Sequence, residues 1–284
     1  MTAVPEFTVI IPTHNHARLL PYAVHSVLAQ TLESFELVVI GDGVGDDTRD
    51  VVADLSRNNK QITFVDRPKS PRTGEPYRHK ELLRRDTPYV TYLSDDDLLL
   101  PDHLEHTREM LATHDLVHGF GLHVDATGSL VLELVDLGQQ WFRQGELEHT
   151  SYVSLTAMGH TMAAYRRLPY GWRTTPPGKF TDHYMFQQFL SDPACRVSTL
   201  RRPTALKFPL IFRRTWTDDE REREIAMWAS RLSDERGRVT LLCEVINLLH
   251  HQAISSVHAL EMIAATRTWR LRNRLVALRR LMQR

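Results

Sequence analysis

The stretch that decides the fold covers residues 89–102 and reads YVTYLSDDDLLLPD. Its first five residues are β-branched, aromatic or leucine, a composition that is typical of a buried strand. Three carboxylates, Asp95, Asp96 and Asp97, follow the strand directly. Such neighbouring like charges need water, a cation or hydrogen-bond donors around them. The stretch therefore predicts a strand that ends in a polar site, although a solvated acidic turn would carry the same residues.

The acidic run also has a place in the sheet that suits a ligand. The carboxyl edge of parallel strands is where open α/β sheets bind their ligands. Hard oxygen ligands at this edge suit Mg²⁺ or Mn²⁺ carrying a diphosphate group. After the run, Asp102 is placed to cap a helix that extends to about Leu111.

The first hundred residues alternate between short apolar runs and helical patterns. Apolar runs at residues 7–11, 35–40 and 62–65 read as strands, and helical spacing fills residues 19–30 and 48–56. This alternation predicts a mostly parallel, doubly wound sheet of the Rossmann-like kind, with right-handed crossovers. Residues 116–134 read as strands with a hairpin, residues 139–148 as a flexible loop over the site, and residues 154–167 as a strand.

A glycine-rich turn follows the second strand but lacks a dinucleotide-binding fingerprint. The segment GDGVGDD, residues 41–47, has Asp46 where G-x-G-x-x-G requires its last glycine. Asp42 still lies at the end of a strand, where it could bind a base or ribose. It could also be a turn residue that accepts backbone amides.

Composition excludes several classes of protein. The chain has 284 residues, with 35 Lys and Arg against 35 Asp and Glu, so a dedicated nucleic-acid binder is not expected. Two cysteines fit a reducing compartment. The first ten residues lack a signal-peptide pattern, and no apolar run reaches about 18 residues. We therefore expect a cytoplasmic protein.

The last 19 residues form a strongly basic segment. Residues 266–284 contain seven arginines and no acidic residue, interleaved with apolar side chains. This pattern predicts a basic amphipathic helix. Two expectations follow: contact with a protein surface, including that of a second copy of the chain, or peripheral contact with the inner face of an anionic membrane. The first is preferred.

Four segments, in this order and spacing, resemble family 2 glycosyltransferases with the GT-A fold, over about residues 7–190. They are FTVIIPTHN (residues 7–15), FELVVIGD (35–42), YVTYLSDDDLLLPD (89–102) and FTDHYMFQQF (180–189). The resemblance implies a GT-A domain over residues 1–212, with a nucleotide-binding half to about residue 100 and an acceptor-binding half after it. Residues 213–284 then form a helical C-terminal extension.

The resemblance also implies roles for individual residues. Thr13 and Asp42 would contact the nucleotide base, and Arg78 would lie near the base or the phosphates. Asp95 to Asp97 match the family's D-x-D element, so Asp95 would face the ribose. Metal ligands would be Asp96 and Asp97, and Ser94 standing where many members have Asp favours Asp96. In the acceptor half, the catalytic base would be Asp182, with His160 and Trp172 on the acceptor side.

The implied chemistry is an inverting, metal-dependent transfer of the hexosyltransferase type. A sugar would move from a nucleotide diphosphate sugar, with a UDP-sugar favoured, to a hydroxyl of a glycan, lipid-linked, protein or small-molecule acceptor. The cofactor would be Mn²⁺ or Mg²⁺. Two alternatives remain open from the residues. One is a nucleotidyltransferase, against which the segment PTHN after the first strand counts. The other is a non-catalytic carbohydrate-binding or scaffold protein.

Overall fold

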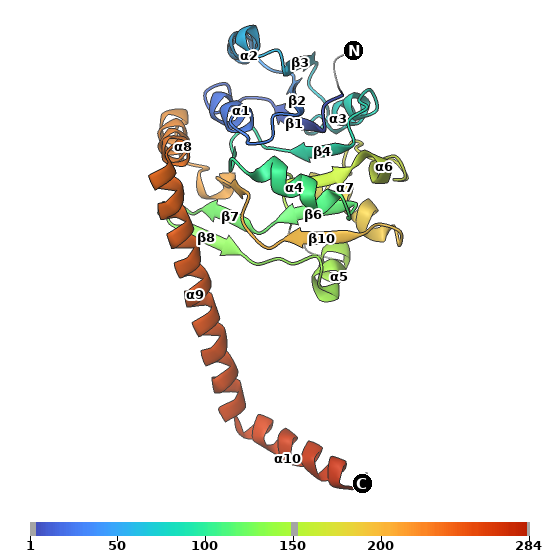
Figure 1. Cartoon of the computed structure of the whole chain (residues 1–284), viewed down its shortest axis with the longest axis vertical. Coiled ribbons are helices and arrows are strands. Elements are labelled where there is room, and N and C mark those ends of the chain that lie inside the picture. Colours follow the sequence, from blue (N-terminus) through green and yellow to red (C-terminus); the bar gives the residue numbers. More distant parts are fainter. Residues whose placement is uncertain (1–3, 149–152, 283–284) are drawn as a thin grey trace. The chain divides into compact units, whose positions relative to one another are not determined.

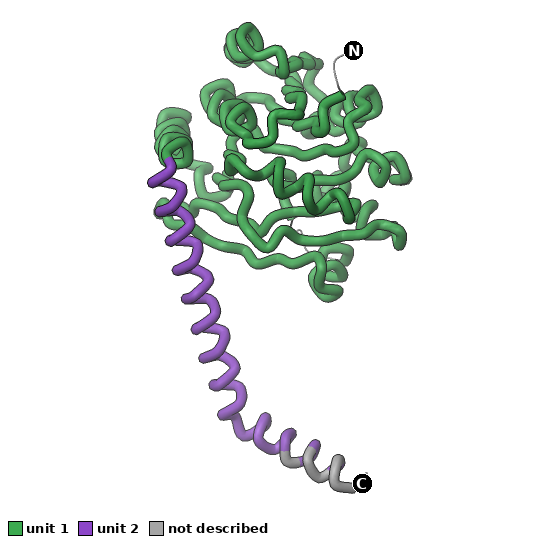
Figure 2. Tube along the Cα trace, in the orientation of Figure 1, with its two compact units in different colours: residues 1–234 green, residues 235–284 purple. Residues whose placement is uncertain are grey.

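A computed structural model describes residues 4–148 and 153–282. The chain forms two compact units, residues 1–234 and residues 235–284 (Figure 2). Helix α8 (Asp218–Ser233) belongs to the first unit. Residues 283 and 284 of the basic C-terminal segment lie outside the described residues.

The first half of unit 1 alternates strands and helices, as the sequence predicts (Figure 1). Its elements are β1 (Phe7–Thr13), α1 (Leu20–Leu28), β2 (Phe35–Asp42), α2 (Asp46–Asn58), β3 (Ile62–Arg67), α3 (Glu75–Leu82), β4 (Tyr89–Tyr92), β5 (Leu98–Leu99) and α4 (His103–Leu111). The predicted cap of α4 is wrong in one respect, because the Asp102 side chain makes no capping hydrogen bond and instead binds the ring of His106.

The second half of unit 1 adds short strands and three further α-helices before α8, counted within the described residues. They are β6 (Leu116–Gly119), β7 (Gly121–Val124), β8 (Leu130–Glu133), α5 (Gln140–Glu148), β9 (Met158–Thr161), α6 (Met162–Tyr165), α7 (Thr181–Ser191), β10 (Val197–Leu200), β11 (Ala205–Leu206) and the 3₁₀ turn η1 (Leu210–Phe212). The β7–β8 pair is the predicted hairpin. The predicted loop at residues 139–148 is helix α5, and the strand predicted at residues 154–167 breaks into β9 and α6.

The central sheet is mostly parallel and has the strand order β10-β6-β9-β4-β1-β2-β3. Strand β1 pairs in parallel with β2 on one side and with β4 on the other. The chain thus reverses its direction of progress across the sheet between β1 and β4, which makes their carboxyl ends the topological switch point. Strand β9 is antiparallel to both of its neighbours, β4 and β6.

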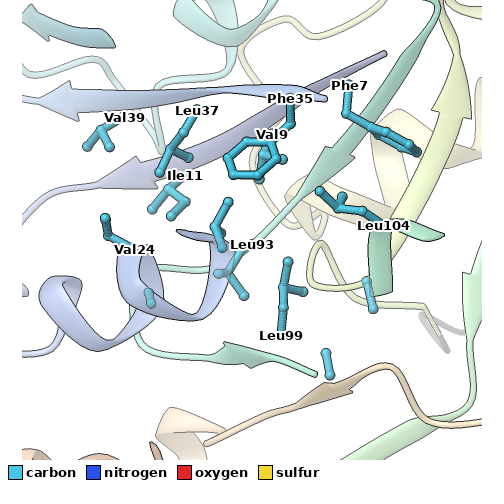
Figure 3. Close-up of a cluster of buried hydrophobic side chains, with 14 of the residues drawn as sticks. Phe7, Val9, Ile11, Val24, Phe35, Leu37, Val39, Leu93, Leu99 and Leu104 are labelled. Carbon is cyan, nitrogen blue, oxygen red and sulfur yellow. The ribbon is translucent and has the colours of Figure 1, made fainter. Parts of the chain in front are cut away.

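Alternate side chains of the central strands enter two buried clusters, one on each face of the sheet. Val9 and Ile11 of β1 belong to one cluster, whereas Ile10 belongs to the other. In Figure 3 the first cluster packs Val9, Ile11 and Leu93 toward helix α1, from which Val24 points inward. These fully buried strands explain why the sequence shows continuous apolar runs rather than alternation.

Unit 2 consists of two helices, α9 (Glu235–Ala265) and α10 (Arg267–Met282). The α10 helix confirms that the basic segment is helical, and its Trp269 and Leu271 side chains are exposed. Within the part of the chain that the structure describes, no helix has the length and apolarity needed to cross a membrane.

Candidate active site

A cavity of about 430 Å³ opens at the switch point of the sheet. Its walls come from the ends of β1, β2 and β4, from the loop between β3 and α3, and from the start of α7. It brings together six residues that the sequence singled out, although residue 182 is far from the others along the chain: Thr13, Asp42, Arg78, Asp95, Asp96 and Asp182.

Arg78 is a buried cation with unused donors on this cavity. Its Nη2 donates to the carbonyl oxygen of Thr73 at 2.6 Å. Its Nε and Nη1 are buried and have no hydrogen-bond partner among the described residues. Burial lowers the pKa of the Arg78 guanidinium, and the charge of Asp182 opposes that shift. A buried guanidinium with free N–H groups fits an anionic ligand, since planar oxyanions accept two bonds from one guanidinium.

Two polar atoms beside β1 share this property. The Oγ1 of Thr13 and the Nδ1 of His14 are buried without a partner in the described part of the chain, and both residues line the cavity. Buried polar atoms are rarely left unpaired in native proteins. The unpaired atoms therefore mark this wall as a place for a polar ligand.

Asp42 is held by the loop that precedes α3. Its Oδ1 accepts from the backbone N–H of Ser70 at 2.6 Å, and its Oδ2 accepts from Lys69 Nζ at 2.6 Å. Gly74, with a φ of +78°, lets this loop turn beside the Asp42 side chain, a conformation that favours glycine. Asp42 is thus both a cavity residue and the anchor of the basic loop.

The acidic run divides its three carboxylates between two tasks. Asp95 Oδ1 accepts from Nδ1 of His16 at 2.8 Å, and Asp96 Oδ2 accepts from Nη2 of Arg221 at 2.9 Å. Ligand atoms of His16, Asp95 and Asp96 lie within 4.8 Å of one another. Burial and then the charges of Asp97 and Asp95 raise the pKa of Asp96 to about 7. Clustered carboxylate oxygens suit a divalent cation such as Mn²⁺.

Asp97, which the sequence predicts to be a metal ligand, has both carboxylate oxygens hydrogen-bonded to protein groups. Its Oδ2 accepts from the hydroxyl of Thr156 at 2.5 Å, and its Oδ1 accepts from the backbone N–H of Phe208 at 2.8 Å. The side chain is buried and is not among the residues that line the cavity. With both oxygens held by protein donors, Asp97 ties together three segments of the fold.

Asp182 lies in the first turn of α7 and faces the same cavity. Its Oδ2 accepts from the backbone N–H of Leu155 at 2.8 Å. Burial raises the pKa of Asp182, and the positive charge of Arg78 partly offsets that rise. A partly buried carboxylate of raised basicity that a neighbouring cation helps to keep ionised can accept a proton from a bound hydroxyl group.

His160 and Trp172, which the sequence predicts on the acceptor side, are not among the residues that line this cavity. His160 is fully buried in β9, and Trp172 is 2% exposed. The indole N–H of Trp172 donates to the Tyr92 hydroxyl at 2.9 Å, and that hydroxyl lies 2.7 Å from Nε2 of His160. Their aromatic rings pack in the core cluster behind the cavity. Periodicity could not separate this role from ligand contact.

Sequence reasoning missed His16, Lys69 and Arg221 as members of the site. His16 directly follows the PTHN segment (residues 12–15), in the polar loop after β1. Lys69 lies in the loop between β3 and α3, and no spacing distinguishes it from Arg72 in the same loop. Arg221 lies in α8, more than 100 residues after the acidic run, and no local pattern points to it.

An open α/β sheet with a charged cavity at its switch point belongs to the class of folds that bind ligands at the carboxyl edge of the strands. Within this class, the model of "Glycosyl transferase family 2" matches residues 8–170. That match covers more than half of the chain, so the chain belongs to glycosyl transferase family 2.

Two curated relatives are similar to part of the chain. A GalNAc(5)-diNAcBac-PP-undecaprenol beta-1,3-glucosyltransferase from Campylobacter jejuni is 26% identical over 164 residues, covering 57% of this chain and 52% of the relative. The succinoglycan biosynthesis protein ExoW from Rhizobium meliloti is 30% identical over 112 residues, covering 39% of this chain and 35% of that protein. The chain thus spans about half the length of the first relative and about a third of the second.

Solved structures confirm the predicted GT-A fold. S. aureus TarS 1-349 in complex with UDP-GlcNAc superimposes with a TM-score of 0.55 at 17% identity, over 72% of this chain and 58% of that TarS fragment. The mannosyltransferase PcManGT from Pyrobaculum calidifontis, in complex with GDP-Man and Mn²⁺, gives 0.53 at 16% identity, over 95% and 83%. At these identities the similarity concerns the fold.

Proposed function

We propose that this chain transfers a sugar from a nucleoside diphosphate sugar to a hydroxyl group of an acceptor, with inversion at the anomeric carbon. One observation carries the proposal. The buried, partly unpaired guanidinium of Arg78, the acidic pair Asp95 and Asp96, and the partly buried carboxylate of Asp182 all line one cavity. Anion binding, cation binding and proton acceptance are the three capacities that such a transfer needs in one place.

The donor is placed by the β1, β2 and β4 walls. Thr13 and Asp42 form the end that takes the base, Asp95 faces the ribose, and Arg78 donates its free N–H groups to phosphate oxygens. UDP is the favoured nucleotide of the donor. TarS was solved with UDP-GlcNAc and PcManGT with GDP-Man, which supports a nucleotide sugar and leaves two bases to compare directly. Thermal-shift measurements with UDP and GDP in the presence of Mn²⁺ make that comparison.

Asp96 is the residue that would hold Mn²⁺ or Mg²⁺, with Asp95 beside it. Clustered carboxylate oxygens and the family's GT-A fold support this assignment, and the oxygen ligands match the preference of both ions. When bound, the ion offsets negative charge on the diphosphate. Asp97 is assigned a structural task instead, because both of its oxygens are already held. Activity that EDTA abolishes and Mn²⁺ restores is the expected result, and full activity in EDTA contradicts metal dependence.

Asp182 accepts the proton of the acceptor hydroxyl. The oxygen then forms a bond to the anomeric carbon while the bond from that carbon to the diphosphate oxygen breaks, and the nucleoside diphosphate leaves with the bonding electrons. Arg78 stabilises the charge that develops on the leaving oxygen atoms. A single displacement inverts the anomeric configuration, and it requires one base and no covalent intermediate.

The substitution Asp182→Asn tests the proposed base. It keeps the shape of the side chain and removes its ability to accept a proton, so turnover should fall by at least 100-fold, the lower range of general-base catalysis. Binding of UDP or GDP should remain nearly unchanged. Asp54→Asn, at an exposed position of α2, is the matched control. Near-normal turnover in Asp182→Asn would remove the base from the mechanism. Pyrophosphate release from a nucleoside triphosphate would instead favour a nucleotidyltransferase.

The sequence leaves four classes of acceptor open: glycan, lipid-linked, protein and small-molecule. Of these we propose the lipid-linked class. The name of the Campylobacter relative contains an undecaprenol-linked acceptor, which supports this class. The exposed Trp269 and Leu271 beside arginines of α10 fit the surface of an anionic membrane. Sedimentation with anionic and with neutral phospholipid vesicles tests this contact. The variant Arg270→Glu/Arg272→Glu should lose binding to anionic vesicles, whereas equal binding by both proteins supports the alternative contact with a protein surface or second copy.

A further inference from the structure

Arg221 enters the candidate metal site from helix α8, which lies outside the residues that the family model matches. The helix begins with a capping box in which Thr217 and Glu220 bind each other's backbone. Arg221 follows in the first turn and is 8% exposed. A buried arginine beside a row of carboxylates needs those partners, because an unpaired buried charge is costly.

Helix α8 is anchored so that Arg221 has a fixed place. Arg221 starts a buried stripe that continues through Ile225, Trp228 and Leu232, with the spacing of one helix face. On the exposed side, Arg18 near α1 forms ion pairs with Asp219 and Glu222, which flank Arg221. The three apolar residues of the stripe pack the helix against the rest of unit 1. Arg221 occupies the first position of the same buried face, so its guanidinium is held in place by this packing.

The guanidinium completes a chain of hydrogen bonds that joins two carboxylates of the acidic run. Nη2 of Arg221 donates to Oδ2 of Asp96 at 2.9 Å, and Nη1 donates to Nε2 of His16 at 3.1 Å. Since Nε2 accepts, the proton of the neutral ring is on Nδ1, which donates to Oδ1 of Asp95 at 2.8 Å. One oxygen of each carboxylate is therefore held by this chain of bonds.

The other oxygen of each carboxylate has no hydrogen-bond partner in the part of the chain that the structure describes. Asp95 and Asp96 line the cavity, whereas Arg221 does not. From these facts we infer that Arg221 is a positioning residue, which together with His16 orients the free oxygens of Asp95 and Asp96 toward a divalent cation in the cavity. This inference rests on the metal site of the proposed function.

The affinity of this chain for Mn²⁺ tests the inference, because a purely electrostatic role and a positioning role of Arg221 predict opposite changes in that affinity. Charge alone predicts that removal of a neighbouring cation strengthens Mn²⁺ binding. A positioning role predicts the opposite, since residues that orient metal ligands are worth about 10- to 100-fold in metal affinity. Arg221→Met should therefore bind Mn²⁺ about tenfold more weakly than the parent in calorimetry and in electron paramagnetic resonance titration. Equal or tighter binding overturns the inference.

Two further variants separate geometry from charge and from loss of folding. Arg221→Lys keeps the charge but cannot bridge Asp96 and His16 with one planar group, so its Mn²⁺ affinity should also fall. An affinity equal to that of the parent would show that charge alone matters and would overturn the inference, even where Arg221→Met fails to fold. Arg223→Met removes an exposed arginine of the same helix and should bind Mn²⁺ as the parent does.

A double-mutant cycle tests whether the bonds act as one unit. His16→Asn should weaken Mn²⁺ binding, and adding Arg221→Met should cost little more, because either change breaks the same chain. Additive losses would show two independent effects and contradict the inference. A parent protein that binds no Mn²⁺ would instead refute the proposed metal site itself, so failure of the proposed function can be told apart from failure of this inference.

Discussion

The guanidinium carbon of Arg78 lies 4.7 Å from the centre of the Trp172 ring. The indole supports the buried cation through its π face, and its N–H donates to the Tyr92 hydroxyl. Trp172 and His160, which the sequence placed beside the acceptor, thus belong to a buried network behind the cavity. Trp172 supports the cavity through its contact with Arg78.

Arg78→Lys should weaken the binding of nucleoside diphosphate about 100-fold. The free Nε and Nη1 of Arg78 are lost, and two hydrogen bonds to a charged ligand contribute about 3 kcal/mol together. Lysine keeps the charge but lacks the planar pair of donors. Calorimetric titration with UDP measures the effect, and Arg84→Lys, at an exposed position just after α3, serves as the control. Unchanged affinity would mean that the phosphates lie elsewhere.

Asp96→Asn and Asp97→Asn should separate metal binding from structure. Asp96→Asn should abolish most Mn²⁺ binding, because it removes a charged ligand of the cluster. Asp97→Asn should retain Mn²⁺ binding but lower the free energy of unfolding by about 1–3 kcal/mol. The substitution replaces one of the two buried acceptor oxygens by an NH₂ group, so one of the hydrogen bonds from Thr156 and Phe208 is lost. Loss of Mn²⁺ binding in Asp97→Asn with unchanged stability would reverse these roles.

The sequence predicted the first half of the fold well because its central strands β1 and β2 are almost entirely buried. Runs such as residues 7–11 and 35–40 contain few polar residues to confuse the pattern, and polar turns separate them from helices with clear periodicity. The acidic run could be placed at the carboxyl edge for the same reason. Once β1 and β4 are parallel neighbours, the residues that follow them must meet.

The second half of the site could not be predicted because its contacts are between distant segments. Arg221 and His16 are 205 residues apart. The spacing of Arg221 with Ile225 and Trp228 places it on the buried face of α8, but it does not indicate which distant carboxylate it pairs with. The roles of His160 and Trp172 depended on which face of β9 and of the following turn points into the core. The sequence could not show which of the three adjacent aspartates faces a metal ion. The hydrogen bonds from Thr156 and Phe208 show that both carboxylate oxygens of Asp97 are already occupied.

The pH dependence of turnover should report the environment of Asp182. The base must be ionised, and burial raises its pKa above 3.8, so kcat/KM should fall as the pH decreases through this raised pKa. Arg78 opposes the rise, so Arg78→Gln should move the acid limb of the profile to higher pH. Initial rates across a range of about four pH units, from pH 4 to 8, at subsaturating donor measure this shift. An acid limb that stays in place in Arg78→Gln would contradict the coupling.

Buried neutral histidines should make the fold sensitive to acid. Burial lowers the pKa of His103 to about 3 and that of His160 to about 4, from an ordinary value of 6.5. Between pH 6.5 and these values the unfolded chain binds more protons than the folded chain, so the free energy of unfolding decreases as the pH falls. Each such histidine contributes about 1 kcal/mol per pH unit between pH 6 and 5.

The contribution of one histidine can be isolated with a pair of variants. His160→Gln cannot take up a proton, so its urea midpoint should depend less on pH than that of the parent, by about 1 kcal/mol per pH unit after conversion to free energy. His258→Gln, at an exposed position of α9, should follow the parent. The His160 variant will be less stable at neutral pH, because Tyr92 loses its ring partner, but the slope and not the absolute stability carries the result. Identical slopes in all three proteins would mean that His160 is protonated as readily in the folded chain as in the unfolded one.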